Sequence, residues 1–149
     1  MKKILLIMMT LACLGSAHAG LRFDAATWRK VPVFNVSNFS KQETSLIGRI
    51  VGVRFHYRSP KLRHLQPNWY EAALWQHDPK AKNGYSFVRV VIAKKDVPAF
   101  KEITSDFNSM SETTVYGRVE TDPENNLPHL RLIGGKASLD AAGNATVDW

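Results

Sequence analysis

Arginines and aromatic residues recur in the segments 54–58 and 85–89, and the segment 69–75 between them begins and ends with a tryptophan. These residue types bind extended anionic ligands. Guanidinium groups hold phosphate or carboxylate through paired hydrogen bonds, and aromatic faces stack on bases or sugar rings. Residues 54–63 add a basic stretch, with three arginines and one lysine and no Asp or Glu. The candidate ligand-binding residues are Arg54, His56, Arg58, Lys61, Arg63, Trp69, Trp75, Tyr85, Phe87 and Arg89.

The histidines, the cysteine and the carboxylates of the sequence do not form a known catalytic or metal-binding motif. The histidines form no H-x-x-H pattern, and the single cysteine, Cys13, has no second cysteine with which to share a zinc site. His77 and Asp78 are adjacent, as turn-forming residues often are. We therefore expect no catalytic residue, no metal site and no cofactor. A metal-dependent hydrolase is the third alternative, because carboxylates from distant positions can meet in a fold.

The first nineteen residues predict an exported protein. Lys2 and Lys3 precede an apolar run at residues 4–12, and residues 17–19 (Ala-His-Ala) supply a cleavage site. The run is shorter than the roughly 20 apolar residues that a transmembrane helix needs. We expect cleavage after Ala19 and release to the periplasm or outside. A lipoprotein anchored at Cys13 is the less favoured alternative, because the residues before it depart from the lipoprotein pattern.

The net charge of the chain is positive. It contains 20 Lys and Arg against 13 Asp and Glu, for a net charge of +7. Loss of Lys2 and Lys3 with the signal peptide would leave a charge of about +5. Such a protein can meet an anionic polymer, a phospholipid surface or an acidic protein, and charge alone does not choose among them.

Alternation of apolar and polar residues predicts a domain made mostly of strands. Asn83-Gly84 is a strong signal for a hairpin turn between two of them. Gly48 and Gly52 indicate a bend or bulge in the first strand. The expected strands cover residues 47–58, 69–76, 85–92, 113–120 and 127–133.

One short helix is expected between the third and fourth strands. Asp96 is placed to cap it, Pro98 lies in its first turn, and Phe100, Ile103 and Phe107 form one apolar stripe. The expected helix ends near residue 108. The chain then divides into a signal peptide at 1–19, an N-terminal arm at 20–43, a barrel at 44–135 and a C-terminal tail at 136–149.

Three strands, a short helix and two further strands resemble the OB-fold, a five-stranded Greek-key barrel. The resemblance covers roughly residues 44–135 and rests on the order of the elements. It implies an all-β domain of the exported bacterial OB-fold type. It also implies an oligonucleotide or oligosaccharide site on the second and third strands and the neighbouring loops.

The candidate residues are expected on the outward faces of the first three strands, with Glu71 pairing to Arg54 or Arg89. The preferred interpretation is an exported, non-catalytic module that binds single-stranded nucleic acid or an acidic glycan. Two alternatives remain open. The N-terminal arm or the C-terminal tail could cover Trp69 and Trp75, or the same face could bind another protein of the cell envelope.

Overall fold

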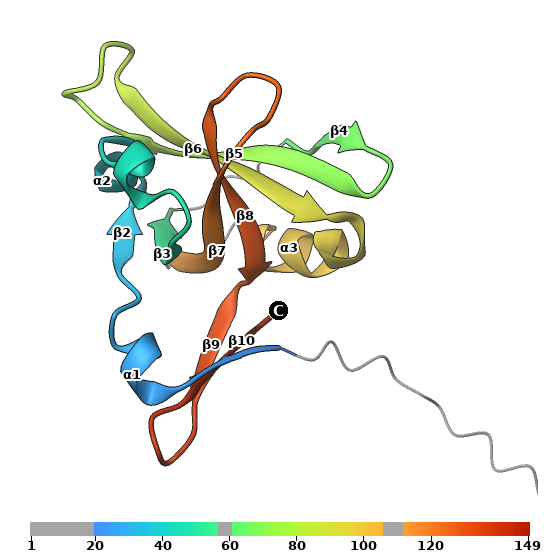
Figure 1. Cartoon of the computed structure of the whole chain (residues 1–149). Helices are drawn as coiled ribbons and strands as arrows, with labels where there is room; N and C mark the ends of the chain where they lie inside the picture. Colours follow the sequence, from blue (N-terminus) through green and yellow to red (C-terminus); the bar gives the residue numbers. More distant parts are fainter. Residues whose placement is uncertain (1–19, 57–60, 106–111) are drawn as a thin grey trace, which may run out of the picture.

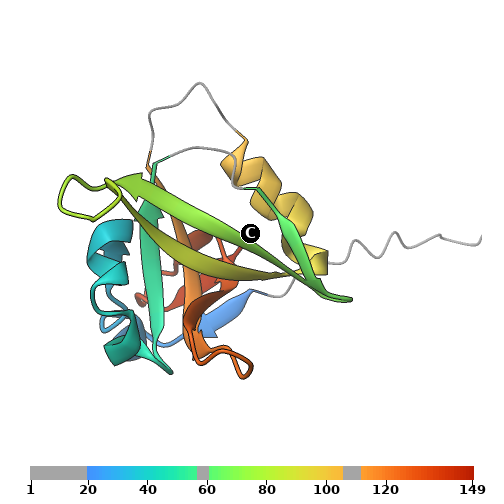
Figure 2. The same ribbon diagram turned by 90° about the horizontal axis from the view of Figure 1, so that it is seen from above.

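The computed structural model describes residues 20–56, 61–105 and 112–149. They form ten strands in two sheets and several short helices, so the protein is mostly β, with more helix than the all-β prediction allowed. One sheet has seven strands in the order β2-β3-β7-β8-β6-β5-β4, and the other has three in the order β1-β10-β9. The hairpin of β5 and β6 crosses β3 and β7 at a steep angle, so the large sheet coils around its own core (Figures 1 and 2).

The five expected strands and the expected helix are all present. The strands are β3 (Ile50–Phe55), β5 (Trp69–His77), β6 (Tyr85–Ala93), β7 (Thr113–Thr121) and β8 (Pro128–Gly134), and the helix is α3 (Val97–Thr104). The short helix η2 (Lys94–Asp96) leads into α3. Asp96 occupies the N-cap position of α3 without a capping hydrogen bond from its side chain. Phe107 lies outside the described residues.

Further elements lie outside those predictions. The large sheet also contains β2 (Val33–Asn35) and β4 (Arg63–Gln66), and the small sheet contains β1 (Leu21–Phe23), β9 (Lys136–Leu139) and β10 (Ala145–Asp148). The N-terminal segment adds α1 (Ala25–Trp28), α2 (Val36–Ser40) and η1 (Glu43–Leu46).

The predicted five-stranded barrel does not form as such, because strands from outside the predicted five lie beside β3 and β5. A closed barrel would need these two strands to pair. Instead β2 pairs in parallel with β3, and β4 pairs with the beginning of β5. In the part of the chain that the structure describes, no ladder joins β3 to β5, and the sheet stays open.

Gly117 allows β7 and β8 to approach closely. A Cβ atom at this position would lie 2.6 Å from the carbonyl oxygen of Arg131. The register between the two strands also shifts between Tyr116 and Gly117, which marks a bulge. The absence of a side chain therefore permits the pairing that holds β7 against β8.

Side chains from the inner face of the large sheet and from α2 and α3 form the core. Alternation along β3 turns Val51, Val53 and Phe55 inward. Val36 and Phe39 from α2 and Phe100 from α3 are fully buried and cover this face. About 2 kcal/mol of stabilisation is typical for burying one such side chain. The large sheet therefore has a continuous core of its own.

Trp28 and Trp149, the tryptophans of the two flanking segments, pack away from Trp69 and Trp75. The ring of Trp28 lies 5.6 Å from Phe23 and 5.4 Å from Tyr116. The ring of Trp149 lies 6.2 Å from that of Phe100. These ring contacts place neither flanking tryptophan over the outer face of β5 and β6.

Candidate functional site

Four ring side chains gather on the outer face of the β5–β6 hairpin, and we call them the ring patch. The register places Trp75 opposite Phe87 and His77 opposite Tyr85. The ring of Tyr85 lies 5.3 Å from that of Trp75 and 5.6 Å from that of His77, both edge-on. Tyr85 and Phe87 are 50% and 62% exposed. Two aromatic side chains are therefore exposed to solvent on this face.

The hairpin is held in place by a polar contact beneath the ring patch. Asp78, at the end of β5, accepts hydrogen bonds from the hydroxyls of Ser37 in α2 and Ser86 in β6, and from the backbone N–H of Lys80. The Ser37 and Ser86 hydroxyls and the Lys80 N–H lower the pKa of Asp78 to about 2. This contact fixes the turn against α2.

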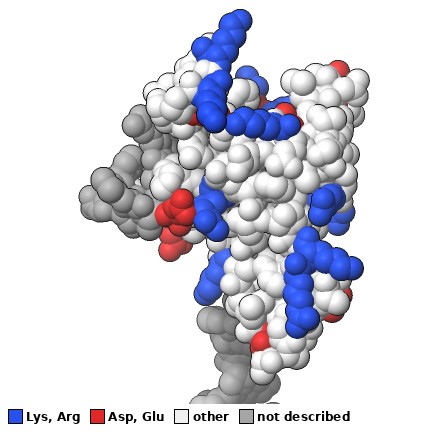
Figure 3. All heavy atoms as spheres, turned by 90° about the vertical axis from the view of Figure 1, so that its left-hand side faces the viewer, with Lys and Arg blue, Asp and Glu red and all other residues white. Residues whose placement is uncertain are grey.

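Lysines lie around the same end of the hairpin. Lys80 and Lys82 are exposed in the β5–β6 turn, and Lys41, just after α2, lies 3.8 Å from Asp78. Figure 3 shows basic side chains gathered at the top of the molecule, where Figure 1 places this turn and α2. Within the described residues, Lys80 and Lys82 form no ion pair, so they are available to an anionic ligand.

The arginines nearest the ring patch are paired with carboxylates. Arg89 bonds to Glu71 at 2.9 Å and to Asp122 at 2.7 Å, and Arg63 donates to the other oxygen of Glu71. This confirms the expected pairing of Glu71 with Arg89. Burial raises the pKa of Glu71, but the hydrogen bonds and charges of Arg63 and Arg89 outweigh it, so the pKa lies below its usual value. The positive charge of Arg89 is therefore largely neutralised by Glu71 and Asp122.

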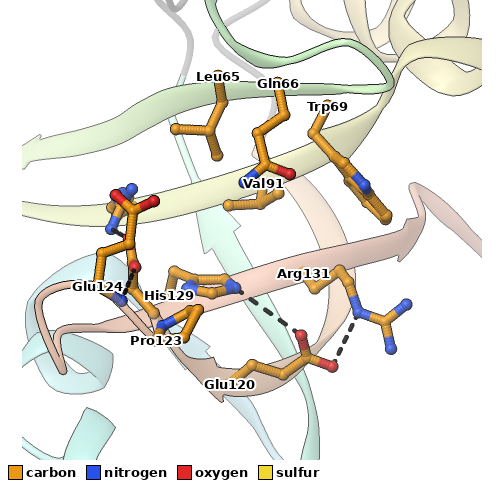
Figure 4. Close-up of a pocket in the computed structure, with 11 residues that line it drawn as sticks. Leu65, Gln66, Trp69, Val91, Glu120, Pro123, Glu124, His129 and Arg131 are labelled. Atoms are coloured by element: carbon orange, nitrogen blue, oxygen red, sulfur yellow. Dashed lines mark hydrogen bonds and ion pairs between the residues drawn. The ribbon is translucent and has the colours of Figure 1, made fainter.

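A cavity of about 310 Å³ lies at the other end of the hairpin, between β4 and the loop that joins β7 to β8 (Figure 4). Leu65, Gln66 and Trp69 lie on one side of it, and Pro123 and Glu124 come from the loop. The remaining lining residues come from β6, β7, β8 and the start of the loop: Arg89, Val91, Glu120, Asp122, His129 and Arg131.

Charged groups on the floor of this cavity are partly paired. Arg131 donates from Nε to Glu120 at 2.8 Å, and His129 Nε2 lies 3.8 Å from the other oxygen of Glu120 (Figure 4). Burial, followed by the positive charge of Arg89, lowers the pKa of His129. The imidazole is therefore neutral near pH 7.

The structure separates the predicted ligand-binding residues into several places. Trp75, Tyr85 and Phe87 belong to the ring patch. Lys61, Arg63, Phe87 and Arg89 line a hollow of about 600 Å³ beside it, and Trp69 lines the cavity under β4.

Arg54 and His56 are not part of this group. Arg54 lies in β3, and both side chains pair with Glu112, at 3.4 and 3.3 Å. The neighbours of β3 are β2 and β7, so its outer face does not continue into that of β5. Arg58 lies outside the described residues.

Several residues of the site were not among the sequence candidates. Nothing in the sequence singles out His77, Lys80 and Lys82, because these residue types are common in turns. They lie just before the Asn-Gly pair that predicts the hairpin turn. Glu120, His129 and Arg131 meet only because β7 pairs with β8 in the sheet. Alternation on one strand predicts which way a side chain faces, but it does not predict which strand lies beside it.

The described residues form neither a metal-binding cluster nor a helix that could cross a membrane. In residues 20–56, 61–105 and 112–149, no three or more His, Cys, Asp or Glu side chains are arranged to hold a metal ion. Over the same ranges, no helix has the length and apolar character needed to span a bilayer.

No family model matches the sequence, and no curated protein matches it. Two solved structures are similar over most of the chain. A protein assigned as an aspartyl-tRNA synthetase from Leishmania major Friedlin is 15% identical with a TM-score of 0.42, over 77% of this chain and only 22% of the synthetase chain. A protein assigned as a nucleic acid-binding lipoprotein from Klebsiella pneumoniae subsp. pneumoniae MGH 78578 is 17% identical with a TM-score of 0.40, over 71% of this chain and 92% of that one. Similarity at this level identifies neither a family nor a ligand.

Proposed function

We propose that this protein is an exported, non-catalytic binding module whose large sheet is an opened OB-like domain. Its ligand is an extended anionic polymer, with single-stranded nucleic acid as the first candidate and an acidic glycan as the second. The order of the strands supports the OB-like assignment, because the helix α3 lies between β6 and β7 and β6 pairs in parallel with β8. The leader-like first nineteen residues support export.

The ring patch carries the proposal. Tyr85 and Phe87 expose their rings two residues apart on one strand, where successive bases or sugar rings could stack on them. Lys80 and Lys82 lie beside them and can meet the backbone charges of a polymer. Of the predicted face, Tyr85 and Phe87 are exposed, whereas Arg54, Arg63 and Arg89 are paired with carboxylates. Lys80 and Lys82 add positive charge that was not part of that face.

Fluorescence titration of the purified protein with an oligothymidylate tests this function, because Trp75 lies within the ring patch. Phe87→Ala removes one stacking face, and the expected result is about tenfold weaker binding. Replacing Lys80 and Lys82 with Ala should reduce the slope of log affinity against log salt by about 1.4. Parallel titrations with alginate, an acidic glycan, and dextran, a neutral glycan, show whether a glycan must be anionic to bind.

Arg54→Ala is the matched control, because it removes a basic side chain of the original candidate set that lies on another face. It should bind the oligonucleotide as the wild type does. Equal loss of affinity in Arg54→Ala and Phe87→Ala would place the ligand elsewhere. Full affinity in Phe87→Ala would reject the ring patch as the binding surface.

A protein partner is the second candidate function. Phe87 and Leu127, which are 62% and 56% exposed, line a hollow of about 350 Å³ between β6 and the β7–β8 loop. An apolar contact of this kind would depend little on salt. Recovery of one envelope protein at both low and high salt by the wild type, and not by Phe87→Ala, would favour this alternative.

A further inference from the structure

The cavity between β4 and the β7–β8 loop is separate from the ring patch. None of the four ring-patch residues lines it, and its volume of about 310 Å³ suits a small molecule. Its residues come from β4, β5, β6, β7, β8 and the loop after β7. The proposed polymer site does not require this cavity, so the cavity could bind a different ligand.

The charges that line the cavity favour a cation. The two arginines already have carboxylate partners: Arg89 pairs with Asp122 and Glu71, and Arg131 pairs with Glu120. Glu124 is exposed and, within the described part of the chain, its carboxylate forms no ion pair. The lining thus has three carboxylates against two guanidinium groups.

His129 adds a hydrogen-bond acceptor. It is only 9% exposed, and in the described residues its Nδ1 has no hydrogen-bond partner. Nε2 is the nitrogen that faces Glu120, so the neutral tautomer with its proton on Nε2 leaves a lone pair on Nδ1. A buried nitrogen without a partner is costly, and a donor supplied by a ligand would relieve that cost.

The opposite side of the cavity is apolar. Leu65 and Trp69 face it from the β4–β5 hairpin, and Val91 lies between them and His129 (Figure 4). Trp69 is only partly exposed, and an indole face attracts a nearby cation. The cavity therefore combines carboxylate and imidazole acceptors with an apolar wall.

We propose that this cavity binds a small organic cation, an ammonium group attached to an apolar or aromatic body. The ammonium lies among Glu120, Glu124 and His129, and the body packs against Leu65, Trp69 and Val91. This proposal is independent of the polymer-binding function, since the two sites share no residue.

Phenethylamine, 2-phenylethanol and phenylacetate test the proposal, because they share a ring and differ in charge. Each is titrated into the ¹⁵N-labelled protein, and the amide shifts of Val91, His129 and Arg131 are followed. Phenethylamine should give saturable shifts at these three amides and bind more tightly than the other two compounds. Glu124→Gln should weaken its binding about threefold, as expected for one exposed charge pair.

Glu102→Gln, which removes an exposed carboxylate from α3, should leave phenethylamine binding unchanged. Phe87→Ala should also leave it unchanged, so loss of the polymer site and loss of the cavity site give different results. The proposal is overturned if phenylacetate binds as tightly as phenethylamine. It is also overturned if no saturable shifts occur at the three amides, or if Glu124→Gln and Glu102→Gln behave alike.

Discussion

Asp78 shows how one buried carboxylate connects local structure to the site. Its partners come from α2, from β6 and from the turn between β5 and β6, so three segments depend on one negative charge. The protonated form would lose some of these hydrogen bonds, which is why its pKa falls to about 2. The position of the ring patch relative to α2 therefore depends on an ionised Asp78.

Replacement of Asp78 by Asn should destabilise the protein most at neutral pH. A carboxyl group with a lowered native pKa adds stability above its unfolded pKa, near 3.8, and this contribution is lost as the pH falls toward 2. The difference in unfolding free energy between wild type and Asp78→Asn should shrink over that interval. Urea unfolding at pH 7, 4 and 2.5 measures it, with Glu102→Gln as the control. A difference that stays constant with pH would contradict the role assigned to this carboxylate.

At the same scale, the sequence predicted which side chains face outward but not what surrounds them. Alternation along β5 and β6 correctly placed Trp75, Tyr85 and Phe87 on one face. The pairing of Arg54 with Glu112 could not be predicted, because the two residues are far apart in sequence and meet only when β7 joins β3. Which distant charges pair depends on which strands are neighbours in the sheet, and alternation within a single sequence does not predict that order.

At the scale of elements, the long alternating strands were predictable and the short strands were not. β2 and β4 have three and four residues, too few for a clear period of two. Yet they lie at the two edges of the large sheet and occupy the positions through which β3 and β5 would have paired. Two short elements thus explain why the structure has an open sheet where a five-stranded barrel was predicted.

Adding even a methyl group at Gly117, in the bulge of β7, should destabilise the protein. In Gly117→Ala the new Cβ would meet the backbone of Arg131 at 2.6 Å, so β7 and β8 must move apart. We expect a loss of about 2 kcal/mol in unfolding free energy, measured by chemical denaturation. Ser138→Ala, at an exposed position of β9, should change stability by less than about 0.5 kcal/mol. Equal stability of the two variants would show that the strands can separate at no cost.

At the scale of the whole molecule, the small sheet adds buried residues of its own beside the large sheet. Ala145 and Val147 of β10 are buried, but the continuous core that the described residues build under the large sheet does not include them. The small sheet joins residues near both ends of the described chain, since Leu21 pairs with Val147. Its stability should therefore differ from that of the large sheet.

Val147→Ala should open the small sheet selectively. The lost methyl groups and the cavity they leave should cost about 2 kcal/mol, and the cost should appear in β1, β9 and β10. Hydrogen exchange followed by NMR measures this as faster exchange of those amides, while the amides of β6 and β8 change less. Equal acceleration in both sheets would show that they unfold as one unit.

The start of the described chain and the β5–β6 turn lie at opposite ends of the molecule. Figure 1 shows the chain entering the fold at β1, beside β9 and β10, while the β5–β6 turn lies at the opposite end. A support attached to the chain ahead of β1 would therefore hold the molecule by its small sheet. Immobilised in this way, on a bead or on a sensor chip, the protein would present the ring patch to the solution.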